Sequence, residues 1–388
     1  MVGNIEQQFR VTPRRFPAID ALRGVLVLMV VLHHVHLRFV LNKYPVATLV
    51  PKPLGRIIFW SGYYAVVMFF VVSGFLITHH SLRRWQSLPR IKLRAFYWLR
   101  FTRIYPCLLL LLAVLTTFHL IGLSGYVIDP QQSSLARAIV AALTFHFNWL
   151  EGTRGYLPGA WDVLWTLSVE ETFYFFFPVT CLLLRRESLS VCALFILIAV
   201  GPVSRVLSEG DPWDSYAYLS CLDCIAFGCL TAWLHERART AERPARTWLT
   251  RTCLIVGASL IGGVIALRET VSNLGLERTG LQVTVLAFGT ALVLWTIAEA
   301  PTDVPPRGSS WLRTVGKGSY EIYLTHMLVV FATVALFRAS QLELSWVFGF
   351  YAAATLTSIA LGLIVARFVG QPLAAALRRA QQRPAAQV

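Results

Sequence analysis

Residues 21–41, ALRGVLVLMVVLHHVHLRFVL, form an apolar stretch that is long enough to cross a lipid bilayer as a helix. A bilayer core requires about 20 consecutive, mostly apolar residues in helical form. Similar stretches follow along the 388 residues, at 57–81, 104–121, 161–184, 189–207, 216–234, 252–268, 280–298, 318–337 and 344–367. Because lipid offers the backbone no hydrogen-bonding partners, these stretches must be helices. We therefore predict an all-α polytopic membrane protein with about ten transmembrane helices.

The composition points the same way. Hydrophobic residues make up 56% of the chain and charged residues only 14%, where about 25% is usual in a soluble domain. This balance excludes a disordered chain and argues against an ordinary soluble enzyme. A further stretch, 137–150, is apolar but too short to cross, and we expect an interfacial or re-entrant helix there.

The net charge of +15 follows from where the basic residues stand. If the N-terminus is cytoplasmic, most of the 35 Lys and Arg residues fall on the cytoplasmic side, among them Arg10, Arg14 and Arg15. This positive-inside bias predicts that both termini are cytoplasmic, and it explains the charge without nucleic-acid binding. The basic stretch 82–103 also suits an anionic ligand or lipid headgroups.

We expect one membrane domain over 21–370, because no linker rich in Pro, Gly or Ser and no internal repeat divides the chain. A cytoplasmic N-terminal segment, 1–20, precedes this domain, and a cytoplasmic C-terminal tail, 371–388, follows it. The longest loop on the other side, 122–160, could cover a site.

Ionisable residues inside membrane spans are costly and usually functional. Arg23 and His34 lie eleven residues apart in the first span, about 20° beyond three full helical turns. They therefore share one helix face, about 16 Å apart along the axis. Such a stripe suits a long ligand with a charged head at the cytoplasmic surface and a reactive end at mid-membrane. The alternative is a polar histidine that a neighbouring helix satisfies.

Two charged pairs stand in later spans. Arg100 and Arg103 share a helix face at the cytoplasmic mouth of the third span, where they could clamp phosphates or simply anchor the helix. Glu170 and Glu171 are adjacent in the fourth span. Neighbouring helix residues diverge, so at most one of them should point at a given site. A structural ion pair is the alternative role for either glutamate.

Three other ionisable residues lie in the sixth and ninth spans. Glu321 and His326 are five residues apart, about 140° from a common face, and need not touch. Asp223 stands between Cys221 and Cys224, but no second CxxC pair exists, so packing of small residues is favoured over zinc or redox chemistry. The chain also lacks an HExxH zinc motif and a GxSxG nucleophile elbow, and we expect no metal ion.

Six motifs follow one another along the chain. They are FPAIDALRG with a later histidine (Arg23 and His34), FFVVSGFLIT (Ser73 and Gly74), FYWLRFTRIYP (Arg100 and Arg103), WTLSVEETFY (Glu170, Glu171 and Tyr174), a DxxxxG helix (Asp223 and Gly228) and GSYEIYLTH (Tyr320 and His326). In this order they resemble the integral-membrane acyltransferase family 3, which comprises bacterial O-acyltransferases of envelope sugars, antibiotics and related acceptors. The resemblance runs from about residue 16 to 372. No SGNH-type hydrolase domain follows in this sequence, so we expect a stand-alone transferase.

The chain departs from the family's pattern at two places. Members often carry Trp before the late histidine, where this chain has Thr325. The family's closing Glu-x-Pro is here Gly370-Gln371-Pro372, so that glutamate is missing. The core motifs are unaffected by either change.

The resemblance implies acyl-CoA, usually acetyl-CoA, as a co-substrate, with no permanently bound cofactor. The CoA head would dock at Arg23, Arg100 and Arg103, and the thioester would reach toward His34. His34 would act as general base on the acceptor hydroxyl. A covalent acyl-histidine relay across the membrane is the rival version.

Other motif residues would support this chemistry. Glu170 or Glu171 would orient or charge a histidine of the site, as a carboxylate does in a triad. His326 would position the acceptor or the tetrahedral oxyanion. Ser73 and Gly74 would allow close helix packing, as small residues do in membranes. The remaining candidates for positioning are Tyr174, Asp223 and Tyr320.

We therefore expect an enzyme of the bacterial cytoplasmic (inner) membrane. It would move an acyl group, most simply acetyl, from cytoplasmic acyl-CoA to a hydroxyl of a cell-envelope glycan or glycoconjugate. Acylation of a cytoplasmic small molecule such as a macrolide is one alternative. A proton-coupled secondary transporter with His34, Glu170 and Glu321 as a relay is another. The expected partners are acyl-CoA, the hydroxyl acceptor and the lipid bilayer.

Overall fold

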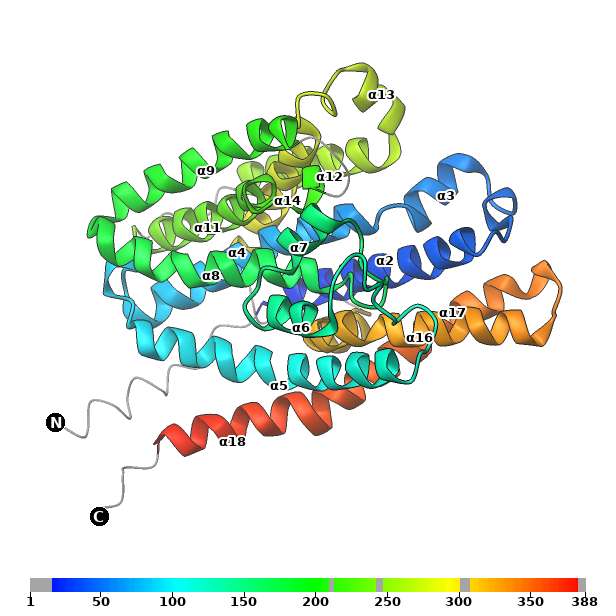
Figure 1. The fold of residues 1–388 in the computed structure, drawn as a ribbon. Coiled ribbons are helices and arrows are strands. Elements are labelled where there is room, and N and C mark those ends of the chain that lie inside the picture. Colours follow the sequence, from blue (N-terminus) through cyan, green and yellow to red (C-terminus); the bar gives the residue numbers. More distant parts are fainter. Residues whose placement is uncertain (1–15, 209–212, 242–246, 301–307, 383–388) are drawn as a thin grey trace, which may run out of the picture.

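The computed structural model describes residues 16–208, 213–241, 247–300 and 308–382. These residues form helices joined by turns and bends, and no strand occurs among them. Figure 1 shows long helices that run side by side in one bundle. Arg10, Arg14 and Arg15, which contribute to the predicted orientation, lie outside the described residues.

Among the described residues, ten helical stretches are long and apolar enough to cross a membrane, which confirms the predicted number of spans. The long helices are α2 (Pro17–Leu41), α4 (Gly62–Trp85), α5 (Leu93–Leu120), α8 (Leu164–Leu184), α9 (Glu187–Leu207), α11 (Tyr218–Thr240), α12 (Thr247–Ala266), α14 (Leu281–Glu299), α16 (Ser319–Ser340) and α17 (Val347–Val365). The shorter helices are α3 (Lys52–Phe59), α6 (Leu135–Leu143), α7 (Phe147–Arg154), α10 (Trp213–Tyr216), α13 (Arg268–Asn273), α15 (Ser310–Lys317) and α18 (Gln371–Gln382). The fold is that of an all-α polytopic membrane protein.

Helix α5 begins well before the apolar stretch that predicts its span. The expected range is 104–121, whereas the helix starts at Leu93. Hydrophobicity marks only the part of a helix that lies in lipid, while Leu and Arg are good helix formers in any surroundings. The basic residues Arg100 and Arg103 therefore stand on a regular helix, three positions apart on one face.

The short stretch predicted over 137–150 consists of two helices, α6 and α7. Phe145 separates them with a φ of 58°, a left-handed conformation that an α-helix cannot pass through. Figure 1 shows both helices level with the middle of the bundle, which favours the re-entrant alternative over the interfacial one. Glu151 of α7 is fully buried and accepts from the Leu157 amide over 3.1 Å. Burial, and then the neighbouring Asp162, raise the pKa of Glu151 well above its usual value.

The predicted C-terminal tail, 371–388, begins as a packed helix. A π-helical turn, Ala366–Gly370, joins α17 to α18, and α18 packs along α5 (Figure 1). The wider turn lets the chain change direction between the two helices. Nε of Arg378 donates to Oγ1 of Thr102 over 3.1 Å, which ties α18 to α5. Residues 383–388 lie outside the described part of the chain.

Most of the buried apolar side chains in the described part of the chain belong to one of two clusters. One cluster lies mainly on α4, α8, α11 and α14. The other lies mainly on α2, α5, α16, α17 and the segment 126–163, which includes α6 and α7. Phe69 and Tyr323 pack against both clusters. These two residues therefore mark a seam that runs between the two halves of the bundle.

Glycines allow α4 and α11 to cross at close range. A β-carbon on Gly74 would lie 2.0 Å from the carbonyl oxygen of Ile225, and one on Gly228 would lie 1.9 Å from that of Val71. No other residue fits at such distances, so the two backbones are in direct contact. The packing role expected for Gly74 agrees with this geometry.

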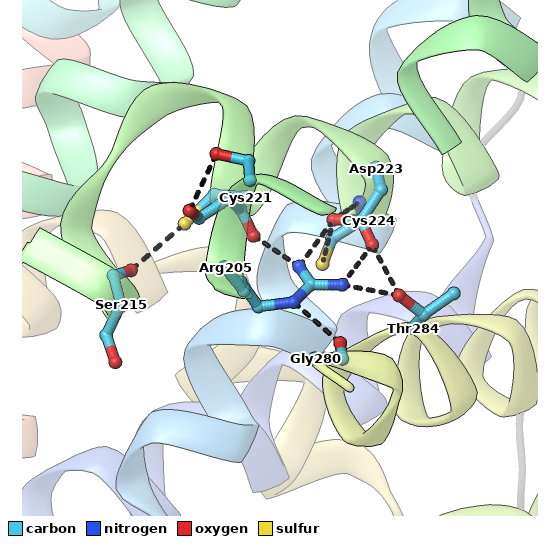
Figure 2. Close-up of polar contacts among 9 residues, drawn as sticks. Arg205, Ser215, Cys221, Asp223, Cys224, Gly280 and Thr284 are labelled. Carbon is cyan, nitrogen blue, oxygen red and sulfur yellow. Dashed lines mark hydrogen bonds and ion pairs between the residues drawn. The ribbon is translucent and has the colours of Figure 1, made fainter. Parts of the chain in front are cut away.

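A buried ion pair joins three helices of the first cluster. Arg205 of α9 donates to both carboxylate oxygens of Asp223 of α11, over 3.0 and 2.7 Å, and to the Gly280 carbonyl over 2.8 Å (Figure 2). Thr284 of α14 donates to Asp223 over 2.8 Å. Asp223, a candidate for positioning at the site, is thus fully engaged in holding helices together. No sequence motif points to its partner Arg205.

Removing one member of this pair should destabilise the bundle strongly. Arg205→Met leaves Asp223 as an unpaired buried charge, and we expect a loss of about 3–5 kcal/mol in the free energy of unfolding. Arg205→Met/Asp223→Leu should recover most of that loss, because apolar groups then fill the site. Thermal unfolding in detergent, followed with a dye that reacts with exposed thiols, measures both variants, since Cys221 and Cys224 are buried. A double variant as unstable as the single one would contradict this account.

Candidate functional site

A cavity of about 640 Å³ lies at the seam between the two clusters. Its wall combines aliphatic and aromatic side chains with polar groups, as small-molecule sites of this size do. The titratable lining residues are Arg23, His80, Arg83, Arg84, Arg100, Arg103, Glu170, Glu171, Tyr174, Tyr320, Tyr323 and Arg378. They come from α2, α4, α5, α8, α16 and α18, so helices that are distant in sequence build one site.

The three arginines predicted to dock a donor lie in this cavity. Arg23 donates to Oγ of Ser319 over 2.8 Å. Arg100 stands 3.7 Å from the centre of the Tyr174 ring and 3.6 Å from a carboxylate oxygen of Glu171. Within the described residues the structure shows no ion pair for Arg103. Since guanidinium groups match phosphates in geometry, the cluster is suited to a polyanion.

Both Glu170 and Glu171 line the cavity, so the prediction that at most one would face a given site is wrong. Ser73 of α4 donates to Glu170 over 2.7 Å, while Glu171 faces Arg100 of α5. The two side chains do diverge by about 100°, as neighbours on a helix must. The cavity is wide enough for α8 to present one carboxylate toward each side. Ser73 thus holds a carboxylate, beyond the packing role expected for it.

His34 of α2 and His326 of α16 meet. Nε2 of His326 lies 3.2 Å from Nδ1 of His34. Neither ring is among the lining residues, so the stripe predicted from Arg23 to His34 starts in the cavity and ends behind its wall. In the described part of the chain, neither histidine forms an ion pair with a carboxylate. The expected pairing with Glu170 or Glu171 is therefore not reproduced, because both glutamates face Ser73 and Arg100 instead.

Backbone carbonyls determine the protonation of the histidine pair. Nδ1 of His326 lies 2.6 Å from the Tyr323 carbonyl oxygen, and Nδ1 of His34 lies 2.9 Å from that of Val30. Because a carbonyl oxygen only accepts, each Nδ1 carries the proton of its neutral ring. Nε2 of His326 then accepts from Nδ1 of His34. Nε2 of His34 keeps a lone pair and can take a proton from a substrate.

Tyr323 separates the histidine pair from the cavity. Its side chain lines the cavity, and its ring centre lies 5.7 Å from that of His326. Its hydroxyl accepts a hydrogen bond from Oγ1 of Thr166 over 2.9 Å. A substrate group in the cavity would reach the histidines past this Tyr323–Thr166 contact. Tyr323 lies inside the last motif, where its spacing alone assigns it no role.

The other candidates take up different places. Tyr320 lines the cavity, and its hydroxyl donates to the Ile104 carbonyl over 2.9 Å. Gly74 faces α11, and Asp223 is held by Arg205, so neither lines the cavity. The lining residues that the motifs do not contain include His80, Arg83, Arg84 and Arg378. The basic stretch 82–103 signals two of these arginines, but no sequence pattern signals His80 or Arg378.

Glu321 occupies the space beside Gly370. A β-carbon on Gly370 would lie 2.9 Å from Oε1 of Glu321. Gly370 stands where the family's pattern has its closing glutamate. Arg103 and Arg23 are the positive charges that act on Glu321. This chain therefore places a carboxylate in the same region from α16 instead of from the π-helical turn before α18.

Exchanging these two positions tests that interpretation. Gly370→Glu alone should destabilise the protein by about 1–3 kcal/mol, because the new side chain is overpacked against Glu321. In Glu321→Ala/Gly370→Glu the new carboxylate can enter the vacated space. We expect this double variant to be more stable than the two single changes predict together, by at least about 0.5 kcal/mol. Thermal unfolding of all four proteins in detergent measures the difference, and additive effects would argue against a shared space.

The chain matches the family model Acyl_transf_3, described as an acyltransferase domain, over residues 16–364. O-acetyltransferase OatA of Staphylococcus aureus strain NCTC 8325 / PS 47 is 25% identical over 336 residues, which cover 82% of this chain and 51% of OatA. SACOL0978 of S. aureus strain COL, whose O-acetyltransferase name is provisional, is 28% identical over 344 residues, again 82% of this chain and 51% of the relative. The chain thus spans about half the length of the curated relatives it matches. No solved structure matches it.

The matched region runs from the start of α2 into α17 and contains the histidine pair, the two glutamates and all the predicted arginines. Helix α18, which adds Arg378 to the cavity, lies beyond it. Since the match covers most of the chain, the chain belongs to the integral-membrane acyltransferase family 3.

Proposed function

We propose that the protein transfers an acyl group, most simply acetyl, from acyl-CoA to a hydroxyl of a cell-envelope glycan or glycoconjugate. The observation that carries this proposal is the cavity, which holds a cluster of arginines and has the His34–His326 pair behind its Tyr323 wall. Arginines suit the phosphates of CoA, and histidine suits proton removal from a hydroxyl. The O-acetyltransferase names of the relatives support the same reaction.

In the proposed reaction, Nε2 of His34 removes the acceptor's proton while the acceptor oxygen attacks the thioester carbonyl. The tetrahedral intermediate then collapses, the C–S bond breaks, and His34 returns the proton to the departing thiolate. His326 accepts from Nδ1 of His34 and so keeps the ring in the tautomer that has a free Nε2. In the rival covalent route, the same Nε2 is the nucleophile: it attacks the thioester carbonyl, and the C–S bond breaks as the thiolate leaves. The acceptor oxygen then attacks the acyl-histidine, and the N–acyl bond breaks.

The proposed location is the cytoplasmic membrane of a bacterium. The arginines of the cavity would face the cytoplasm, because the positive-inside bias predicts that both termini and the 82–103 stretch lie there. Acyl-CoA would then enter from the side on which cells make it. The long segment 122–160, which contains α6 and α7, favours a glycan acceptor on the opposite side over a cytoplasmic small molecule.

The contacts do not favour the transporter alternative. Its relay would consist of His34, Glu170 and Glu321. In the described structure His34 contacts His326, Glu170 accepts from Ser73, and Glu321 lies beside Gly370. No hydrogen bond or ion pair between described residues joins the three groups of the relay to one another.

Donor binding is the first test of the proposal. The protein in nanodiscs should bind radiolabelled acetyl-CoA, and Arg100→Ala/Arg103→Ala should weaken that binding at least about tenfold, because charge-assisted hydrogen bonds are lost. Arg94→Ala is a matched control, since Arg94 stands on the same helix but is exposed and does not line the cavity. Absence of binding by the unaltered protein would refute the proposed donor.

Turnover tests the role of His34. His34→Ala should lower kcat at least about 100-fold, the usual contribution of a general base, while donor affinity stays the same. His33→Ala is the control: it removes the neighbouring imidazole, whose Nδ1 lies 2.8 Å from the Phe59 carbonyl oxygen and away from His326. Acyl transfer from labelled acetyl-CoA to an envelope glycan fraction is measured after gel filtration shows intact folding. A folded His34→Ala protein with normal transfer would rule the mechanism out.

A further inference from the structure

Four guanidinium groups form a row in the cavity. The positive charge of Arg103 acts on both Arg23 and Arg378, and that of Arg378 acts on Arg84. Arg103 therefore lies near Arg23 and Arg378, and Arg378 lies near Arg84. Helices α2, α5, α18 and α4 contribute one of these four lining residues each. Because like charges repel, a cavity that gathers these four side chains favours a bound polyanion.

Arg378 is held in place on one side only. Its Nε donates to Oγ1 of Thr102 over 3.1 Å, and the Thr102 hydroxyl donates in turn to the Leu99 carbonyl over 3.2 Å. Thr102 is fully buried, so the anchor is rigid. Within the described residues, the terminal nitrogens of Arg378 make no hydrogen bond or ion pair. The fork of this guanidinium is thus fixed and available to a ligand.

The acidic residues act on one end of this row, at Arg23 and Arg103. Glu170 and Glu171 are the carboxylates among the described lining residues of the cavity, and they face Ser73 and Arg100. Glu321 also lies near Arg23 and Arg103, which form the same end of the row. The other end of the row, at Arg378 and Arg84, is therefore the more strongly positive.

This distribution fits one feature of coenzyme A, which carries two separate phosphate groups: a diphosphate, and a phosphomonoester on the ribose. We infer that Arg378, together with Arg84, binds the ribose phosphomonoester of the donor, while Arg23 and Arg103 bind its diphosphate. The inference rests on the proposed acyl-CoA donor. It makes α18, which lies beyond the region matched by the family model, part of the donor site.

Removal of the phosphomonoester isolates the proposed contact. The full chain in phosphatidylcholine nanodiscs is titrated with coenzyme A and with 3′-dephospho-coenzyme A. We expect Arg378→Ala to lower the affinity for coenzyme A at least about tenfold and to leave the affinity for dephospho-coenzyme A unchanged. The reason is that only coenzyme A loses a charge-assisted hydrogen bond. Arg379→Ala is the matched control, since it removes the same charge from the next residue of α18, which does not line the cavity.

A second variant tests the anchor. Thr102→Val keeps the shape of the buried side chain but cannot accept from Arg378. Thr102 acts here as a positioning residue, so we expect a smaller loss of coenzyme A affinity and again no change with dephospho-coenzyme A. If Thr102 had a merely structural role, Thr102→Val would lower the affinities for both ligands alike. Thermal unfolding checks that each variant folds.

The outcomes separate this inference from the proposed function. If the unaltered protein binds neither ligand, the acyl-CoA donor itself is wrong. If it binds both and Arg378→Ala changes neither affinity or both equally, the donor stands and the role of Arg378 is overturned. The same titrations in nanodiscs with phosphatidylglycerol test a lipid phosphate as the source. If Arg378→Ala acts only there, by relieving competition from the anionic lipid, the site belongs to the headgroup and the inference fails.

Discussion

A charged group among apolar helices must find a partner, because no water is present to solvate it, and this constraint organises the bundle. Arg205 donates hydrogen bonds to both carboxylate oxygens of Asp223. Arg100 faces Glu171 and stacks on the ring of Tyr174. Arg103 lacks such a partner within the described structure. Positive charge in excess of the available carboxylates is thus gathered in one cavity, which is where an anionic substrate would restore the balance.

The second organising feature is the seam between the two apolar clusters. The cavity follows the seam, and Tyr323, which packs against both clusters, stands at the point where the cavity meets His326. Binding groups and reactive groups are therefore kept apart by one side chain. In the proposed reaction the thioester and the base could meet only past the Tyr323–Thr166 contact.

The sequence motifs account for much of the candidate site and miss the rest for identifiable reasons. Spacing along one helix puts Arg23 and His34 on a common face, but it says nothing of the wall that hides the histidine. The predicted angle between Glu170 and Glu171 is correct. The width of the cavity that both side chains line cannot be predicted from the pattern of one helix. The sequence predicts that Arg378 belongs to a C-terminal tail, and only the structure shows that α18 packs on α5.

Hydrophobic stretches determined the number and type of the membrane helices, since the solvation of the backbone in lipid depends only on local composition and length. They also determined which ionisable residues would be costly to bury. Tertiary structure alone decided the partners: His34 with His326, Asp223 with Arg205, and the row of arginines from four helices. These partners depend on how helices distant in sequence cross and rotate against one another, and the pattern of a single helix carries no information about that.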